Sequence, residues 1–407
     1  MLRELFPRFH GRILAQPILG PFLDGFSEWL FQHGHTKVAV RRHIRTARLL
    51  EGRLAHAGIQ SAGELTRSAL RGCSPSYSQD DVGRAALVSA LDRYLLAEGR
   101  FKMDPLRPLE EKAMAYGEHL REARGFAPST IHQHTDTAIA FLDHLHYDGS
   151  PSTLAHINAS DIESFVKSTG QRIGRTSLQH AIAQVRGFLR YLALRGEACQ
   201  GLDTQIDSPR VYRGEYLPRA LPWDTVKAFL RAIDRSTPMG MRDFAIFLLI
   251  VTYGMRANEV VGLQLEDLEW RKERIRLIQR KTGGNLFLPI TDTVGAGLID
   301  YLQHGRPNLP YREVFLRARA PEGILMPTAV NEAFQAWGRR GGLGIPFQGP
   351  HCLRHSLAVH LLQQGASLKE IGDLLGHRNA ESTCVYIRLA VEDLRDVALP
   401  LPTRRQP

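Results

Sequence analysis

Apolar residues recur every three or four positions through most of this chain, which is the spacing with which an α-helix buries one face. Val40 and Ile44 follow this spacing, and so do Ile131 and Ala138. Between 274 and 290 the pattern changes, because two β-rich runs flank a Lys-Thr-Gly-Gly sequence and predict a hairpin that turns at the glycines. We therefore expect a mainly α-helical protein, with two tandem helical domains followed by a mostly helical domain that contains a small antiparallel β-sheet.

Two stretches of the helical part resemble each other. Residues 34–58 can be laid over residues 125–149 without a gap, and residues 88–99 match residues 185–196. The identical pairs include Gly34 and Gly125, His43 and His134, Leu54 and Leu145, Gly58 and Gly149, and the Arg-Tyr-Leu triplets at 93–95 and 190–192. Coincidence between two ordinary amphipathic helices is the alternative. Because the match recurs at both ends of the unit, we interpret it as an internal duplication of about 90 residues.

Proline-rich segments mark the expected domain boundaries. The sequence "DPLRPL" at 104–109 links the two copies, and "DSPRVYRGEYLPRALP" at 207–222 leads into the third region. The expected divisions are a first helical domain at 1–103, a second at 104–207, a linker at 208–218 and a last domain at 219–407.

The charge of the chain favours a polyanionic partner. Its 407 residues include 52 lysines and arginines against 42 acidic residues, which gives a formal net charge of +10 and a pI near 9.6. Such an excess fits nucleic acid, although it could also serve solubility alone.

Cysteine spacing and hydropathy bear on the compartment. The four cysteines lie far apart without a CxxC pair, which argues against a disulfide framework or a zinc ribbon and fits a reducing compartment. The longest apolar run, at 244–255, is shorter than the ~20 residues that a membrane span needs, and residues 1–12 lack the apolar core of a secretion signal. We expect a soluble protein that stays inside the cell and makes no contact with a membrane.

Arginines form a stripe on the first helical copy. They recur there at i, i+4 and i+7 beside the apolar face, where the second copy has Gln133 and Asp136. A charged stripe is usually a solvated helix face, but arginines with few interleaved acids would also follow the phosphates of a nucleic acid. The candidate DNA contacts in the two copies are Arg41, Arg45, Arg48, Arg186 and Arg190.

A helix expected at 349–365, between a proline and a glycine, opens with two histidines and an arginine. His351, Arg354 and His355 lie in its first turns, and His351 and Arg354 share a face because they are three residues apart. The free N–H groups and the dipole of a helix N-terminus attract an oxyanion, so these side chains would complete a site for a phosphate.

Zinc is the competing ligand for this helix, because His351 and His355 have the i, i+4 spacing of metalloprotease helices. Such a site needs a glutamate after the first histidine as general base, whereas this chain has Cys352 there. Arg354 would also place a cation beside the metal. We therefore expect no metal, and we interpret His355 as a packed or hydrogen-bonded residue that supports the site.

Two short segments follow this helix. Ser367 and Glu370 have the spacing of a capping box and Gly376 ends the helix, which puts His377 just past its end. Tyr386 follows nine residues later on another expected helix. Taken singly, a histidine there is usually a surface residue and such a tyrosine is normally part of the core.

Upstream, "TYGMRANEVVGL" at 252–263 ends one helix at a glycine and starts another. This leaves Arg256 in the corner, with Glu259 three residues on. Alone, the two residues would be interpreted as an arginine–glutamate pair that caps a turn.

Together and in this order, "TYGMRANEVVGL", "HCLRH", "LLGH" and a tyrosine nine residues after the last histidine resemble the motifs of the tyrosine recombinase (phage integrase) family. The likeness covers the region 220–395, and residues 110–205 resemble that family's helical core-binding domain. The internal repeat then makes residues 20–100 a second copy of that domain. Many integrases have a small strand-containing arm-binding domain at this end, so the second helical module departs from the family.

The resemblance implies a role for each motif residue. Arg256 and Arg354 would clamp the non-bridging oxygens of a scissile phosphodiester and neutralise the charge of the transition state. Tyr386 would attack phosphorus and form a 3′-phosphotyrosyl intermediate, with His351 as the candidate base. The remaining assignments are Lys281 as the proton donor to the departing 5′-oxygen, His377 as a hydrogen-bond donor to the phosphate, and Glu259 as the carboxylate that fixes Arg256 or His351.

The resemblance thus implies a site-specific recombinase or integrase that cleaves and rejoins double-stranded DNA without metal, cofactor or ATP, for a mobile genetic element. Four protomers would act on two synapsed sites, in the bacterial cytoplasm at the nucleoid. Two alternatives stay open at this point. One is a catalytically silent DNA-binding accessory protein, and the other is a type IB topoisomerase-like enzyme, which shares the nucleophile chemistry but acts alone.

Overall fold

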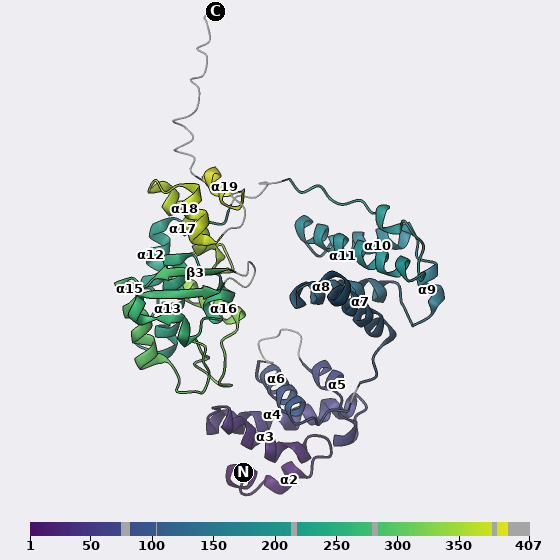
Figure 1. Cartoon of the computed structure of the whole chain (residues 1–407). Helices are drawn as coiled ribbons and strands as arrows, with labels where there is room; N and C mark the ends of the chain where they lie inside the picture. The colour runs from purple at the N-terminus through teal and green to yellow at the C-terminus, as the bar shows by residue number, and fades with distance from the viewer. Residues whose placement is uncertain (75–81, 103, 213–217, 279–283, 377–380, 390–407) are drawn as a thin grey trace, which may run out of the picture. The chain divides into compact units, whose positions relative to one another are not determined.

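The computed structural model describes residues 1–74, 82–102, 104–212, 218–278, 284–376 and 381–389. The chain divides into two compact units, one comprising Met1–Gly63, Cys73–Gly99 and Tyr216–Pro407, and the other comprising Glu64–Gly72 and Arg100–Glu215. Over these described ranges the protein is helical apart from one three-stranded antiparallel sheet and isolated bridges (Figure 1). The expectation of a mainly α-helical protein with a small antiparallel sheet is therefore confirmed.

The N-terminal region consists of short helices and three longer ones. Its elements are α1 (Leu2–Leu5), α2 (His10–Leu14), α3 (Gly20–Gln32), α4 (Lys37–His56), the 3₁₀ turn η1 (Ala62–Glu64), α5 (Arg67–Gly72) and α6 (Val82–Ala97). The side chain of Thr36 caps the start of α4. Val40, Ile44 and Leu54 are fully buried, so the apolar spacing in the sequence marks the face of α4 that packs inward.

A second group of helices follows the first along the chain. Its elements are α7 (Pro108–Arg124), α8 (Pro128–His144), α9 (Pro151–Ala155), α10 (Ala159–Gly170), α11 (Arg175–Leu194) and the 3₁₀ turn η3 (Leu202–Thr204). Phe141 of α8 and Phe188 of α11 lie in its core. Helix α10 begins at a capping box, in which Asn158 accepts hydrogen bonds from the backbone of Ser160 and Asp161.

The two helical groups repeat one set of ring contacts. In each group, one aromatic ring touches a histidine and a tyrosine that the sequence repeat matches to one another. The ring and its partners are Phe26 with His43 and Tyr94 in the first group, at centroid distances of 6.4 and 5.5 Å. In the second they are Tyr116 with His134 and Tyr191, at 6.1 and 5.2 Å. The matched residues therefore occupy equivalent places inside each group.

The last region is built around one central helix. Its helices are α12 (Trp223–Arg231), α13 (Pro238–Tyr253), α14 (Ala257–Val261), α15 (Asp292–Asp300), α16 (Pro327–Arg340), α17 (His351–Gln363), α18 (Leu368–Leu375) and α19 (Glu381–Cys384), with the short turns η4 (Leu265–Asp267), η5 (Trp270–Lys272), η6 (Tyr301–Gly305) and η7 (Val385–Leu389). Every residue of α13 from 245 to 251 is buried, because α12, α14, α15, α16 and α17 all pack against it. Its C-terminal end is thereby held within the core.

The sheet contains β1 (Leu268–Glu269), β2 (Arg274–Ile278) and β3 (Asn285–Pro289), in that order. Strands β2 and β3 are antiparallel, with Ile275 opposite Leu288 and Ile278 opposite Asn285. Ile275 and Leu288 are buried, as the alternating pattern requires. The two strands of the expected hairpin are confirmed, whereas residues 279–283 between them, including Lys281, lie outside the described residues.

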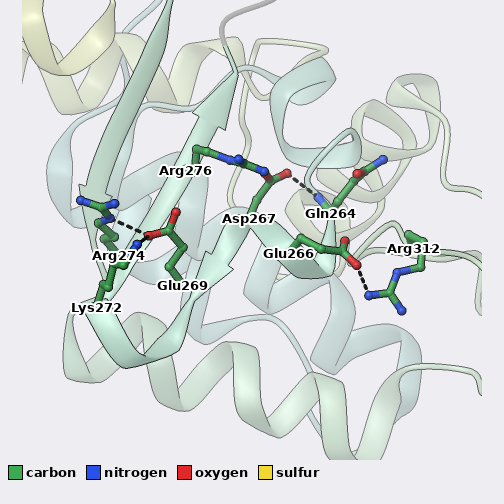
Figure 2. A network of polar contacts seen from close by, with 8 residues as sticks. All are labelled: Gln264, Glu266, Asp267, Glu269, Lys272, Arg274, Arg276 and Arg312. Atoms are coloured by element: carbon green, nitrogen blue, oxygen red, sulfur yellow. Dashed lines mark hydrogen bonds and ion pairs between the residues drawn. The ribbon is translucent and has the colours of Figure 1, made fainter.

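A polar network joins the sheet to the turn that follows α14 (Figure 2). The Asp267 carboxylate accepts a hydrogen bond from the backbone N–H of Gln264 at 3.0 Å and two from the Arg276 guanidinium at 3.0 and 2.8 Å. Asp267 is only 5% exposed. Beside it, Glu266 pairs with Arg312 at the surface. The buried carboxylate thus fastens strand β2 to turn η4.

Asp267→Ala should lower the free energy of unfolding by about 1–3 kcal/mol, because it leaves a backbone N–H and a guanidinium without their buried acceptor. Denaturant titration of the purified protein measures this loss. Glu266→Ala is the matched control, and it should change the stability little because its ion pair is exposed. Equal losses for the two variants would contradict the anchoring role of Asp267.

A buried histidine makes the first helical group sensitive to acid. Burial lowers the pKa of His43 to about 4, and the positive charges of His35, Arg42 and Arg93 act in the same direction. The unfolded chain takes up a proton on this residue below about pH 6.5, whereas the folded chain does not, so stability is lost as the pH falls. From pH 7 to 5 the loss through this group should be about 2 kcal/mol.

His43→Phe should remove that part of the pH dependence, since the ring contact with Phe26 survives without a titrating group. Hydrogen exchange of the α4 amides at pH 7 and pH 5 measures the local stability. The account of His43 is wrong if wild type and variant lose the same protection between the two pH values.

Candidate active site

Arg256 is held at the corner between α13 and α14. The chain turns there through Gly254, whose φ of 65° is in the left-handed region and whose missing Cβ leaves room for the side chain of Leu375. Glu259 accepts a hydrogen bond from the Arg256 backbone at 2.8 Å and another from its guanidinium at 2.7 Å. The predicted pair is therefore present, and it aims a partly exposed arginine from a helix start.

Arg354 lies in the interior, with 3% of its surface exposed. It comes from the first turn of α17, and its guanidinium donates hydrogen bonds to the carbonyl oxygens of Gly254 and Leu375, the latter at 2.5 Å. These carbonyls end helices α13 and α18. A single side chain thus joins three segments that are far apart in the sequence.

The two arginines raise the positive potential of the site. Burial and, after it, the charge of Arg256 lower the pKa of Arg354 to about 10, while Glu259 and Tyr386 act against them. The group therefore remains a cation at neutral pH. Two like charges held in this way favour the binding of an anion, which would relieve their repulsion.

Tyr386 lies in η7 and is 2% exposed. Its ring packs in a cluster with Leu357, Ile371 and Leu375, so the ordinary core role is part of its environment. Burial raises the pKa of the phenol, and the charges of Arg354 and then Arg256 pull it down. The tyrosine is therefore both a core residue and a neighbour of the two cations.

Two histidines of α17 lie near this tyrosine. The Nδ1 atom of His355 and the phenol oxygen of Tyr386 lie 3.0 Å apart in a hydrogen bond. The His351 ring meets the His355 ring edge to face, with centroids 4.5 Å apart. His351 is exposed at the first position of the helix, yet the protein around it, followed by the charges of Arg354 and Arg256, lowers its pKa.

The structure brings together Arg256, Glu259, Arg354, His351, His355 and Tyr386 of the candidate residues. Lys281 and His377 lie outside the described residues, although their neighbours are placed. Strand β2 ends at Ile278, and the capping box of Ser367 and Glu370 starts α18 as predicted, with Gly376 at its C-terminal cap.

In the described ranges, no group of three or more His, Cys, Asp or Glu side chains is placed so that it could hold a metal ion. Cys352, which follows His351, is buried, and burial raises the pKa of its thiol to about 12. Its sulfur therefore stays protonated at neutral pH.

The candidate DNA contacts of α4 divide into two kinds. Arg45 and Arg48 are exposed, as a phosphate contact requires. Arg41 is half-buried, and its guanidinium lies 5.5 Å from the centre of the Phe6 ring. The stripe is therefore only partly a solvated surface.

The two candidates on α11 hold the segment that follows it. Arg186 donates a hydrogen bond to the carbonyl oxygen of Ile206 at 2.5 Å, and Arg190 donates to Asp203 at 2.7 Å. Both arginines thus have intramolecular acceptors around η3, a use that the sequence did not indicate.

Sequence reasoning missed the acceptors of Arg354 and the contact between His355 and Tyr386. The acceptors are backbone carbonyls 100 and 21 residues away, and a carbonyl carries no residue-type signal. The Asp267–Arg276 pair was also missed, although both residues fall within the short segment "LEDLEWRKERIRL", in which an acidic turn precedes a strand with arginines.

None of the helices in the described ranges is long and apolar enough to cross a membrane. The chain matches the description "Phage integrase family" over residues 219–393 and the description "Phage integrase, N-terminal SAM-like domain" over residues 113–196. These two ranges overlap the regions 220–395 and 110–205, in which the sequence resembles the family.

Relatives and solved structures agree with these matches. "Putative integrase/recombinase y4rA" of Sinorhizobium fredii is 32% identical over 97% of this chain and 98% of its own length. "Tyrosine recombinase XerD" of Listeria monocytogenes is 31% identical over 61% of this chain and 82% of its own length. A lambda integrase tetramer bound to a Holliday junction has the same fold, with a TM-score of 0.53 at 16% identity over 75% of this chain and 88% of that chain. On the motifs, the matched regions and a relative similar along its whole length, this chain belongs to the tyrosine recombinase (phage integrase) family.

Proposed function

We propose that this enzyme cleaves and rejoins double-stranded DNA at specific sites through a 3′-phosphotyrosyl bond on Tyr386, without metal or ATP, and that it serves a mobile genetic element. One observation supports the proposal most strongly. The buried phenol of Tyr386 lies near both Arg354 and Arg256, and the charge of each acts to lower its pKa. An oxygen nucleophile beside two fixed cations is what transfer of a phosphodiester requires.

In the proposed reaction, the phenol oxygen of Tyr386 attacks the scissile phosphorus and the 5′-oxygen departs. Arg256 and Arg354 clamp the non-bridging oxygens, whose negative charge grows in the transition state. A donor of this kind typically contributes a factor of about 10² to 10³ in rate. The bond to tyrosine conserves the energy of the phosphodiester, so a 5′-hydroxyl can reverse the step and no nucleotide is consumed.

The other polar residues take supporting parts. Lys281 protonates the departing 5′-oxygen and His377 donates a hydrogen bond to the phosphate, both as the family motif suggests. His351 assists at the phenol or the phosphate. Glu259 orients Arg256, which its two hydrogen bonds to that residue support.

The proposed domains are tandem DNA-binding modules at 1–103 and 104–207, a linker at 208–218 and the catalytic domain at 219–407. The repeated ring contacts around Phe26 and Tyr116 support the view that the first module is a second copy of the core-binding domain. Arg45 and Arg48 of the first module then contact phosphates, and Arg41 supports them. Arg186 and Arg190 contact DNA only through those guanidinium N–H groups that are not already used in their intramolecular hydrogen bonds.

The oligomeric state and the cellular location are proposed by analogy with similar proteins. The solved lambda integrase is a tetramer bound to a Holliday junction. Four copies of this chain would likewise act on two synapsed sites, at the nucleoid in the cytoplasm. The integrase/recombinase name of the relative from Sinorhizobium fredii supports a role in integration.

Cleavage and the joining of two duplexes together separate this proposal from the two alternatives. A catalytically silent accessory protein would bind the site without a covalent adduct. A type IB topoisomerase-like enzyme would form the adduct but would not ligate two different duplexes to each other. Joining of two differently labelled duplexes is therefore the result that distinguishes recombination.

Tyr386→Phe should abolish the covalent adduct with a nicked suicide duplex and leave DNA affinity nearly unchanged, because the substitution removes only the attacking oxygen. Denaturing gel electrophoresis measures the adduct, and mobility shift measures the affinity. A Phe variant that still forms the adduct would mean that another residue is the nucleophile.

Arg45→Ala combined with Arg48→Ala should weaken DNA binding and reduce the slope of log affinity against log salt by about 2, since each phosphate contact contributes nearly one. Arg12→Ala with Arg53→Ala is the matched control, because it removes the same charge from exposed positions outside the stripe. Equal effects in the two double variants would attribute the change to net charge alone. If the slope of log affinity against log salt is unchanged in Arg45→Ala with Arg48→Ala, these arginines lie on a solvated helix face and do not contact DNA.

A further inference from the structure

The phenol oxygen of Tyr386, which is the reacting atom, lies in a hydrogen bond with Nδ1 of His355 at 3.0 Å. His355 lies in the first half of α17, one turn after His351 and next to Arg354. The ring of His351 touches the ring of His355, with centroids 4.5 Å apart. The histidine expected to act as base therefore stands beside the one that contacts the phenol.

A buried phenol needs an acceptor at the moment of attack. Tyr386 is 2% exposed, so bulk water is a poor acceptor for its proton. Burial raises the pKa of this phenol, and the two arginines only partly offset that effect. A general base must lie within hydrogen-bond reach of the proton that it takes, and His355 meets this requirement in the resting protein.

We propose that Nδ1 of His355, rather than His351, accepts the phenol proton of Tyr386 during strand cleavage and returns it during ligation. This assignment rests on the proposed function and names the base within it. It requires the tautomer of His355 that carries its proton on Nε2, so that Nδ1 accepts from the phenol.

The step balances in both directions. In cleavage, the bond between the Tyr386 oxygen and phosphorus forms, the bond to the 5′-oxygen breaks, and the phenol proton moves to Nδ1 of His355. The 5′-oxygen takes its proton from the donor proposed at Lys281. In ligation, the 5′-hydroxyl attacks phosphorus, and the departing phenol oxygen takes back the proton from the His355 imidazolium.

The surrounding charges make the transfer of the proton to His355 depend on bound DNA. Arg354 precedes His355 on α17, and the charges of Arg354 and Arg256 both act on the phenol that His355 contacts. Both charges therefore oppose a further positive charge on the His355 ring. Glu259 is already engaged with Arg256, and His351 adds a second titrating ring on α17. A bound phosphodiester brings the missing negative charge. Proton transfer is therefore favoured when the scissile phosphate lies between the arginines.

His355→Asn separates proton transfer from positioning. The amide oxygen of asparagine reaches close to the place of Nδ1, so it can accept the hydrogen bond of the phenol but cannot take its proton. Adduct formation on a nicked suicide duplex should slow by about 10²- to 10⁴-fold, the usual contribution of a general base. DNA affinity should stay at the wild-type level.

His360→Asn is the control on the same helix. His360 is five residues further on, about 140° around the helix from His355, and its ring stacks on Trp223. This variant should form the adduct at the wild-type rate. A near-normal rate for His355→Asn would overturn the proposal, because the hydrogen bond alone would then suffice.

A more acidic nucleophile provides the second measurement. Replacing Tyr386 by a fluorinated tyrosine, whose phenol loses its proton more easily, should restore most of the rate in His355→Asn and change the wild-type rate little. A misfolded variant would not recover in this way. Failure to recover would overturn the assignment, and so would recovery in His351→Asn but not in His355→Asn, because His351 would then be the base.

The wild-type reaction separates this proposal from the one on which it rests. If wild-type protein forms no adduct on a duplex that it binds, the proposed function fails and the base assignment falls with it. If wild type forms the adduct and His355→Asn keeps the same rate, only the base assignment fails.

Discussion

The buried guanidinium of Arg354 is the constraint on which the rest of the site depends. It donates to the carbonyl oxygens of Gly254 and Leu375, which end α13 and α18. The C-terminal ends of helices carry unsatisfied carbonyls and partial negative charge, so they offset part of the cost of burying this cation. Arg256 follows the first carbonyl by two residues. Motif residues that are more than a hundred positions apart converge because this side chain joins them.

The same constraint explains how a core tyrosine can be a nucleophile. Tyr386 packs against Leu375 in a small apolar cluster that also contains Leu357 and Ile371. This burial keeps the phenol protonated, and Arg354 on the neighbouring helix keeps its oxygen within reach of positive charge. A reactive oxygen is thereby shielded from water in the resting state, while the groups that would activate it are already in place.

Sequence reasoning predicted those features of the site that arise from local rules. The pairing of Arg256 with Glu259, the capping box of Ser367 and the strands around Lys281 follow from short-range spacing, and the structure has each of the pairings that fall in its described residues. The buried face of α4 followed from helical periodicity in the same way.

Long-range partners could not be predicted in this manner. The acceptors of Arg354 are backbone atoms, and the contact of His355 with Tyr386 depends on how η7 packs on α17. We interpreted Arg186 and Arg190 as phosphate contacts because nothing in the sequence indicated that the turn around η3 folds back onto α11. Such pairings are set by tertiary packing, which overrides the simplest interpretation of a charged helix face.

We propose above all that the phenol oxygen of Tyr386 becomes bonded to DNA phosphorus. Mass spectrometry of the wild-type covalent complex, trapped on a nicked duplex and digested with nuclease and protease, tests it most directly. A nucleotide should be attached to the peptide that contains Tyr386, with fragment ions that place it on that tyrosine. A nucleotide on any other residue, or a trapped complex in which Tyr386 is unmodified, would mean that Tyr386 is not the nucleophile.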